Sequence, residues 1–81
     1  MVEATLLFQS IDDVKAFAAI ANTKPYDIDL VSGKYLINAK SIMGIFSLDL
    51  THPIKVVAYT DENDSFLEQI GQFLYAQQTQ I

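Results

Sequence analysis

Hydrophobic and polar residues follow strand-like periods in four short parts of this chain. Residues 26–31 and 34–39 alternate apolar with polar side chains, which predicts two half-buried strands. The serine–glycine pair at 32–33 is typical of a tight hairpin turn between them. Residues 4–9 alternate imperfectly, which indicates a strand buried on more than one side, and the β-branched residues of 54–60 favour a fourth strand.

The segment after the first strand predicts a helix over residues 11–22. Ser10 is a favourable N-cap, and Asp12 and Asp13 suit the positive end of the helix dipole. Apolar residues then recur at helical spacing and predict a buried stripe that consists of Ile11, Val14, Phe17, Ala18 and Ala21.

Two further helices are expected in the second half of the chain. Ser41 is a suitable cap for a short helix over residues 42–48. The acidic segment 61–64 is interpreted as the start of the last helix, and residues 77–81 are expected to fray. The last helix has a predicted buried stripe that consists of Phe66, Leu67, Ile70, Phe73 and Leu74.

The order of these elements is βαββαβα, which predicts an α+β fold. Short strands, one hairpin and intervening helices favour a four-stranded antiparallel sheet with three helices on one face. The 81 residues, 51% hydrophobic and 19% charged, have the composition of one ordinary globular domain that spans residues 1–81.

Composition and charge exclude several classes of function. Ten acidic against five basic residues give a net charge of −5, which disfavours binding to nucleic acid. With one histidine and no cysteine, we expect no disulfide, metal or cofactor. We expect a soluble cytoplasmic protein without membrane insertion, because no apolar run approaches ~18 residues and the amino terminus lacks signal-peptide features.

The segment from Ala39 to Leu50 carries the candidate functional residues. Ser41, at the start of a helix and beside Lys40, is well placed to carry a phosphate. Lys40 is also a candidate for partner binding, together with three apolar residues of the helix that follows, namely Ile42, Met43 and Phe46. This pattern predicts a regulated docking site.

The Lys40-Ser41-Ile42-Met43-Gly44 motif resembles the regulatory-serine segment of HPr, the histidine-containing phosphocarrier of bacterial sugar-uptake phosphotransferase systems. The resemblance extends over residues 26–70 and implies the HPr-like open-faced sandwich. It further implies that a bifunctional kinase/phosphorylase phosphorylates Ser41 and that the phosphoserine form assists a carbon-catabolite regulator of transcription. It also implies that Ile42, Met43 and Phe46 dock enzyme I, the kinase and other partners.

The chain departs from this family at the phosphocarrier site. A Gly-x-His-x-Arg-Pro segment is missing, and its histidine, arginine and proline correspond to Ser10, Asp12 and Asp13. Two carboxylates therefore stand where a phosphate would be held, so we do not expect phosphoryl relay or enzymatic activity. The leading hypothesis is a regulatory or binding domain in sugar-uptake control.

Alternative interpretations stay open at this point. Ser41 is also explained as a helix cap alone, and Ile42, Met43 and Phe46 as core residues. His52 is interpreted as a solvated loop residue, or as the acceptor of a residual phosphocarrier. A structural, self-associating module is the third possibility.

Overall fold

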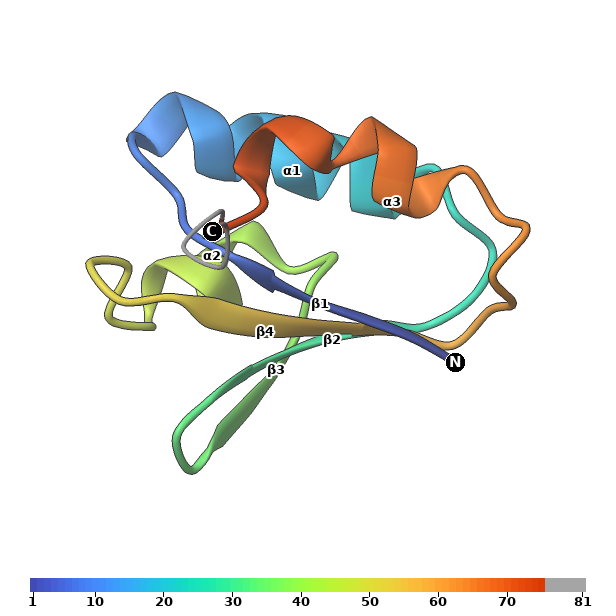
Figure 1. The fold of residues 1–81 in the computed structure, drawn as a ribbon. Coiled ribbons are helices and arrows are strands. Elements are labelled where there is room, and N and C mark those ends of the chain that lie inside the picture. Colours follow the sequence, from blue (N-terminus) through green and yellow to red (C-terminus); the bar gives the residue numbers. More distant parts are fainter. Residues whose placement is uncertain (76–81) are drawn as a thin grey trace, which may run out of the picture.

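The computed structural model describes residues 1–75, which form one sheet and a layer of helices (Figure 1). The strands are β1 (Val2–Leu6), β2 (Ile28–Ser32), β3 (Tyr35–Asn38) and β4 (Ile54–Ala58), and the helices are α1 (Ile11–Asn22), α2 (Ile42–Phe46) and α3 (Phe66–Gln69), followed by the 3-10 turn η1 (Gly71–Phe73). This order confirms the predicted βαββαβα arrangement. The predicted fraying of residues 77–81 lies outside the described residues.

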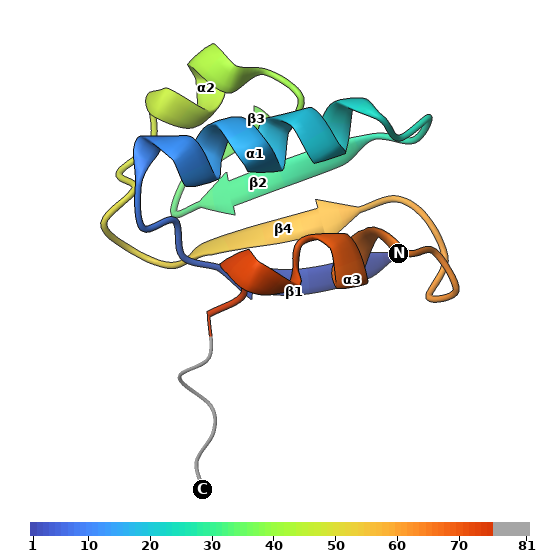
Figure 2. The same ribbon diagram turned by 90° about the horizontal axis from the view of Figure 1, so that it is seen from above.

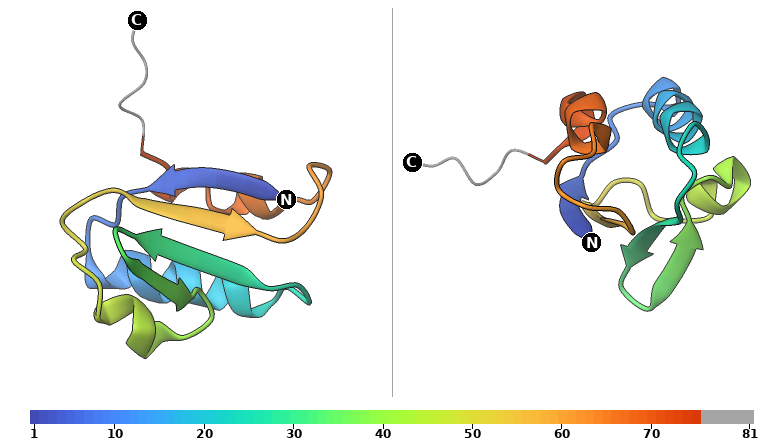
Figure 3. Two further views of the ribbon diagram at one scale, coloured as in Figure 1. Left: turned by 90° about the horizontal axis from the view of Figure 1, so that it is seen from below. Right: turned by 90° about the vertical axis from the view of Figure 1, so that its right-hand side faces the viewer.

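The four strands form a single antiparallel sheet in the order β1-β4-β2-β3. Figures 1 and 2 show α1, α2 and α3 on one side of this sheet. The view from below in Figure 3 shows the opposite side of the strands, which carries no helix of the described residues. The α+β, open-faced two-layer prediction is therefore confirmed.

The first helix begins at the predicted residue because two side chains satisfy its free backbone donors. Ser10 Oγ accepts a hydrogen bond from the Asp13 N–H at 3.2 Å, and Asp13 Oδ2 accepts one from the Gln9 N–H at 2.9 Å. This reciprocal pair resembles a capping box. At the other end, the Thr23 hydroxyl donates to the Ile20 carbonyl at 2.6 Å and ends the helix.

Aromatic rings fill the space between the helices and the sheet. The Phe17 ring of α1 is fully buried, and its centroid lies 5.4 Å from Phe8, 6.2 Å from Phe73 and 6.3 Å from Phe66. The strands complete this core with alternating apolar residues, which include Val2, Leu6, Ile28, Leu30, Ile54 and Val56. The edge-to-face packing of these rings and the buried aliphatic area hold the two layers together.

The prediction that Ile11 belongs to the core is wrong, since its side chain is 63% exposed. Ile11 is the first residue of α1, and helical side chains lean toward the amino terminus of their helix. Its side chain therefore projects past the start of α1 instead of into the layer below. The other four residues of the predicted stripe are buried.

The ends of β1 and α2 differ from those predicted. β1 ends at Leu6 instead of residue 9, because Phe8 leaves the sheet to join the ring cluster. α2 ends at Phe46 instead of residue 48, and the Ser47 N–H then bonds to the Gly44 carbonyl as a cap at 3.1 Å.

The acidic segment 61–64 forms a turn and not the start of the last helix. Asp61 Oδ1 accepts a hydrogen bond from the Asn63 N–H at 2.9 Å, as short polar side chains often do in competition with a helix. Helix α3 begins at Phe66, where the N–H donates to Asp64 Oδ1 at 2.9 Å. The predicted stripe holds for Phe66, Ile70 and Phe73, whereas Leu67 is half-buried and Leu74 is exposed.

The outer edge of β1 is covered by the chain that follows η1. The Leu7 N–H donates to the Phe73 carbonyl at 2.9 Å, and the Tyr75 N–H donates to the Thr5 carbonyl at 2.8 Å. One edge of the sheet is thus partly closed by extended backbone, and β3 forms the other edge.

Candidate functional site

Ser41 stands at the surface as the cap of α2. Its Oγ accepts a hydrogen bond from the Gly44 N–H at 3.2 Å, and its backbone is extended before the helix begins at Ile42. A Cβ on Gly44 would lie 2.6 Å from Ile37 Cγ2 and 3.2 Å from Ser41 Oγ. Glycine at this position therefore lets α2 lie directly against β3 while the serine cap forms.

Lys40 is tied to the loop after α1. Its Nζ donates to the Lys24 carbonyl at 2.7 Å, and its own carbonyl accepts a hydrogen bond from Asn22 Nδ2 at 3.1 Å. The Lys40 ammonium group therefore holds the approach to α2 against the end of α1. It remains a cation one residue from Ser41, but its hydrogen bond is made to backbone oxygen.

The apolar residues of α2 divide between core and surface. Ile45 is fully buried and Ile42 is half-buried against the core, whereas Met43 is 77% exposed and Phe46 is 38% exposed. We call Ile42, Met43 and Phe46 the α2 patch. Figure 2 shows α2 beside the first half of α1, whose first residue is the exposed Ile11.

The start of α1 has a different chemistry. The hydroxyl of Ser10 and the carboxylate of Asp13 are used in the cap, and Asp12 is exposed beside them. This arrangement holds no imidazole, and its formal charge is negative. An incoming phosphoryl group would meet two carboxylates here and no basic side chain from residues 9–14.

His52 lies in the loop before β4. Its Nε2 is 3.3 Å from Asp49 Oδ2, and both side chains are exposed. Hydrogen bonds from the Thr51 hydroxyl and N–H, and then the nearby His52, hold the pKa of Asp49 below its usual value.

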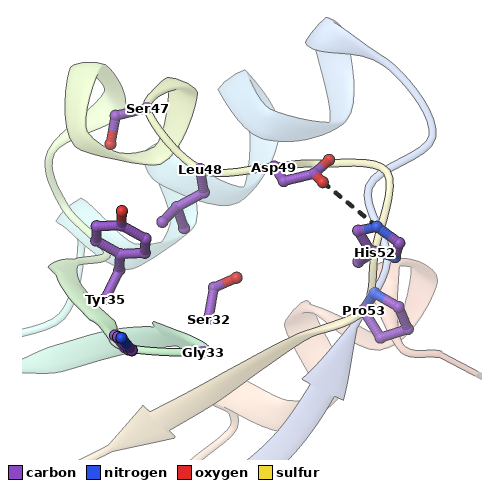
Figure 4. Close-up of a pocket in the computed structure, with 9 residues that line it drawn as sticks. Ser32, Gly33, Tyr35, Ser47, Leu48, Asp49, His52 and Pro53 are labelled. Atoms are coloured by element: carbon purple, nitrogen blue, oxygen red, sulfur yellow. Dashed lines mark ion pairs between the residues drawn. The ribbon is translucent and has the colours of Figure 1, made fainter.

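This pair borders a hollow of about 640 Å³ between the β2–β3 turn and the loop after α2 (Figure 4). Figure 4 shows Tyr35 on one side of the hollow and His52 with Pro53 on the other. No group of three potential metal ligands occurs among residues 1–75, and no helix in that part is long and apolar enough to cross a bilayer.

Solved structures of phosphocarrier proteins match this arrangement of elements. HPr-C-His from Thermoanaerobacter tengcongensis matches with a TM-score of 0.73 at 24% identity, over 89% of each chain. HPr from Bacillus anthracis matches with a TM-score of 0.69 at 22% identity, over 91% of this chain and 96% of that one. The histidine-containing phosphocarrier protein of Mycoplasma matches with a TM-score of 0.70 at 17% identity, over 88% and 89%.

The chain has the HPr-like fold. No family model matches the sequence, and no curated protein is significantly similar to it. The HPr-like fold places Ser10 at the cap of α1 and Ser41 at the cap of α2, as expected from the sequence.

The structure also brings forward residues that the sequence did not single out as functional. The helical spacing predicts Ile11 in the core, yet it lies on the surface at the start of α1. Tyr35 and Leu36 are 67% and 64% exposed on the edge strand β3. The alternating pattern of β3 predicted a strand but gave no sign that it would be an edge.

Proposed function

We propose that this HPr-like chain is a regulatory domain that binds protein partners through the α2 patch and is controlled at Ser41. It would act in the control of sugar uptake without carrying phosphoryl groups and without enzymatic activity. The observation that carries this proposal is the exposure of Met43 and Phe46 on a helix that begins at an exposed serine. Exposed large apolar side chains in a cluster are typical of interaction sites.

The geometry at Ser41 is compatible with regulation by phosphate. Phosphorylation adds a charge of about −1.5 to −2 at a serine. Ser41 is at the surface, and its cap is a single hydrogen bond on a helix of five residues. A phosphate there would change the charge beside Met43 without opening the buried core.

The residues at the start of α1 support the proposal that this chain does not carry phosphoryl groups. Phosphoryl transfer through a side chain needs a nucleophile and groups that stabilise the phosphate. Ser10 is occupied as a cap, and Asp12 and Asp13 add negative charge around it. These residues maintain the helix and oppose a phosphate.

Binding measurements with a purified HPr kinase/phosphorylase test the docking role. We expect Met43→Ala and Phe46→Ala each to weaken binding about ten-fold, as truncation of a contact in the centre of an interface does. Leu74→Ala is the matched control, because Leu74 is as exposed as Phe46 but lies after η1. Equal binding by all four proteins, with their folds intact, would exclude the α2 patch as the docking site for this partner. An enzyme I-like protein and a transcriptional regulator are the other candidate partners to test in the same way.

A residual phosphocarrier that uses His52 is the second candidate function. One observation favours it, namely the exposed imidazole 3.3 Å from the Asp49 carboxylate, which would orient the ring. Incubation with enzyme I and phosphoenolpyruvate would place acid-labile phosphate on His52 if this function is present. Absence of that phosphate would end the hypothesis.

A further inference from the structure

The outer edge of β3 offers unpaired backbone groups. Gly33, with a φ of 59°, and Lys34 form a two-residue turn, so Ser32 and Tyr35 face each other at the end of the ladder. The Ala39 N–H continues the ladder by donating to the Ile28 carbonyl at 2.8 Å. Odd-numbered residues of β3 therefore point their backbone groups at β2, and even-numbered residues point theirs outward.

Three of these outward groups have no backbone partner among residues 1–75. They are the N–H and carbonyl of Leu36 and the N–H of Asn38, since the Asn38 carbonyl accepts from the Ser41 N–H at 3.0 Å. Exposed edges of this kind pair readily with another extended chain. The hairpin that carries them projects away from the helices in Figure 1.

The side chains at this edge are apolar on both faces. Leu36 faces the open side of the sheet with its ladder partner Val31, and Tyr35 faces the helix side with Ile37. Tyr35 and Leu36 are more than 60% exposed. An added strand would cover apolar area on both faces and form backbone hydrogen bonds.

The charges around β3 differ in sign from those of the whole protein. Residues 33–48 contain Lys34 and Lys40 and no acidic residue, in a chain of net charge −5. Neither lysine forms an ion pair within the described part of the chain. Two carboxylates approach this region, Asp29 opposite Asn38 and Asp49 across the hollow.

Both of these carboxylates make contacts with other side chains of the chain. Asp29 interacts with the Tyr59 hydroxyl, and Asp49 accepts hydrogen bonds from Thr51 and pairs with His52. Lys34, and the absence of acidic residues from 33–48, make this edge less negative than the rest of the chain, while Lys40 Nζ donates to the Lys24 carbonyl. Charge complementarity favours an acidic occupant over a second copy of this acidic chain.

We propose that β3 binds an extended acidic segment of a partner protein, which adds to the sheet as a fifth strand. The Leu36 and Asn38 backbone groups hold the strand, Tyr35 and Leu36 contact its alternating side chains, and Lys34 faces its acidic end beside the β2–β3 turn. The edge of β3 is distinct from the α2 patch. The proposal of an added strand can therefore be wrong while the proposed function holds.

The experiment is an NMR titration of the full chain at low salt with a nine-residue peptide. The peptide has two glutamates at each end and five alternating valine and threonine residues between them. We expect the Leu36 and Asn38 amides to shift and their hydrogen exchange to slow, whereas the inward Tyr35 and Ile37 amides keep their exchange rates. A peptide N-methylated at alternate residues and one with lysine in place of glutamate should not bind.

Charge variants sharpen the result. Lys34→Glu should weaken binding roughly two- to five-fold, as expected for exposed ion pairs, whereas Lys15→Glu on α1 makes the same charge change and should have no effect beyond the change in net charge. Leu36→Pro should abolish binding, since it removes one outward N–H.

Three outcomes overturn the proposal. Absence of shifts at millimolar peptide excludes an acidic strand as the occupant. Shifts confined to Met43 and Phe46 assign the peptide to the α2 patch instead. Shifts at Leu36 and Asn38 that depend on protein concentration without peptide identify a second copy as the occupant.

Discussion

Two helices of this protein begin in the same way and present different chemistry. Ser10 Oγ and Ser41 Oγ each accept a hydrogen bond from the backbone N–H three residues later, at 3.2 Å in both cases. The first turn after Ser10 carries Asp12 and Asp13, whereas the helix after Ser41 has no charged residue and exposes Met43 and Phe46. The geometry of a cap therefore does not define a phosphate site, and the side chains around it decide what it can bind.

The largest expected effect comes from Gly44, which allows the second cap to lie against the sheet. Gly44→Ala places a methyl group 2.6 Å from Ile37 Cγ2, on a β-branched side chain with little freedom to move. We expect the free energy of unfolding to fall by about 1–3 kcal/mol, as in overpacked cores. Urea titration measures this loss.

Gly71→Ala is the control for that prediction, since nothing lies within 4 Å of its added Cβ. We expect no loss of stability from it. Equal losses in the two variants would mean that helix propensity or another general effect, and not the contact with Ile37, explains Gly44.

The first cap is expected to be purely structural. Ser10→Ala removes the acceptor of the Asp13 N–H and should cost about 1 kcal/mol of unfolding free energy. Ser10→Asp retains a cap acceptor but places a third carboxylate beside Asp12 and Asp13, so we expect it to recover only part of this loss. Thermal unfolding of the three proteins checks the order, and a full recovery with aspartate would contradict the electrostatic part of this account.

The helix α3 begins at a carboxylate instead of a serine hydroxyl, so the contact at its start depends on pH. The Tyr26 hydroxyl donates to Asp64 Oδ1 at 2.8 Å, which also accepts the Phe66 N–H. The hydrogen bond from Tyr26, then that from Phe66 and the nearby Lys24, lowers the pKa of Asp64. Burial, then the hydrogen bond and charge of Asp64, raises the pKa of Tyr26.

The signs of these two shifts fix the pH dependence. A lowered carboxyl pKa gives stability that is present above pH ~4 and lost as pH falls through the folded-state pKa. A raised tyrosine pKa gives stability that is present below pH ~10 and lost as pH rises above it. We expect the unfolding free energy of Tyr26→Phe to change less with pH than that of the wild type, in both the acidic and the alkaline range. Urea titration at a series of pH values measures this. If the unfolding free energies of Tyr26→Phe and the wild type depend on pH in the same way, the Tyr26–Asp64 contact is excluded as the source of that dependence.

The smallest expected effect on stability is that of Ser41→Asp. Aspartate is as good an N-cap as serine, so the unfolding free energy should change by less than about 0.5 kcal/mol. Binding of a partner at the α2 patch should change, because a negative charge now stands beside Met43. A large loss of stability with no effect on binding would contradict a regulatory role for this position.

The sequence was sufficient for the fold because local signals agreed with one another. The hairpin signal, the caps Ser10 and Ser41 and the strand periods each predicted an element that is present, although the turn lies at residues 33–34 instead of 32–33. Errors occurred where the position within a helix or a local side-chain hydrogen bond decided the outcome. Ile11 has helical spacing but lies at the first position of α1, and the acidic segment 61–64 forms a turn that precedes α3.

The candidate site could be predicted only in part. The sequence placed Ser41 at a helix start, but helical spacing alone could not separate buried Ile45 from exposed Met43 in a helix of five residues. The hydrogen bond from Lys40 to the Lys24 carbonyl joins residues 16 positions apart, so no local pattern reveals it. The open edge of β3 likewise follows from strand order, which the periods of single strands do not specify.

Phosphate mapping tests the central claim most directly. The intact protein is incubated in parallel with ATP and an HPr kinase/phosphorylase and with phosphoenolpyruvate and enzyme I, and fragments are analysed by mass spectrometry under conditions that preserve acid-labile phosphate. Our account predicts phosphate on Ser41 in the first reaction, none on Ser10, and none on any residue in the second. Phosphate on Ser10 or His52, or an unmodified Ser41 in the folded protein, would contradict it.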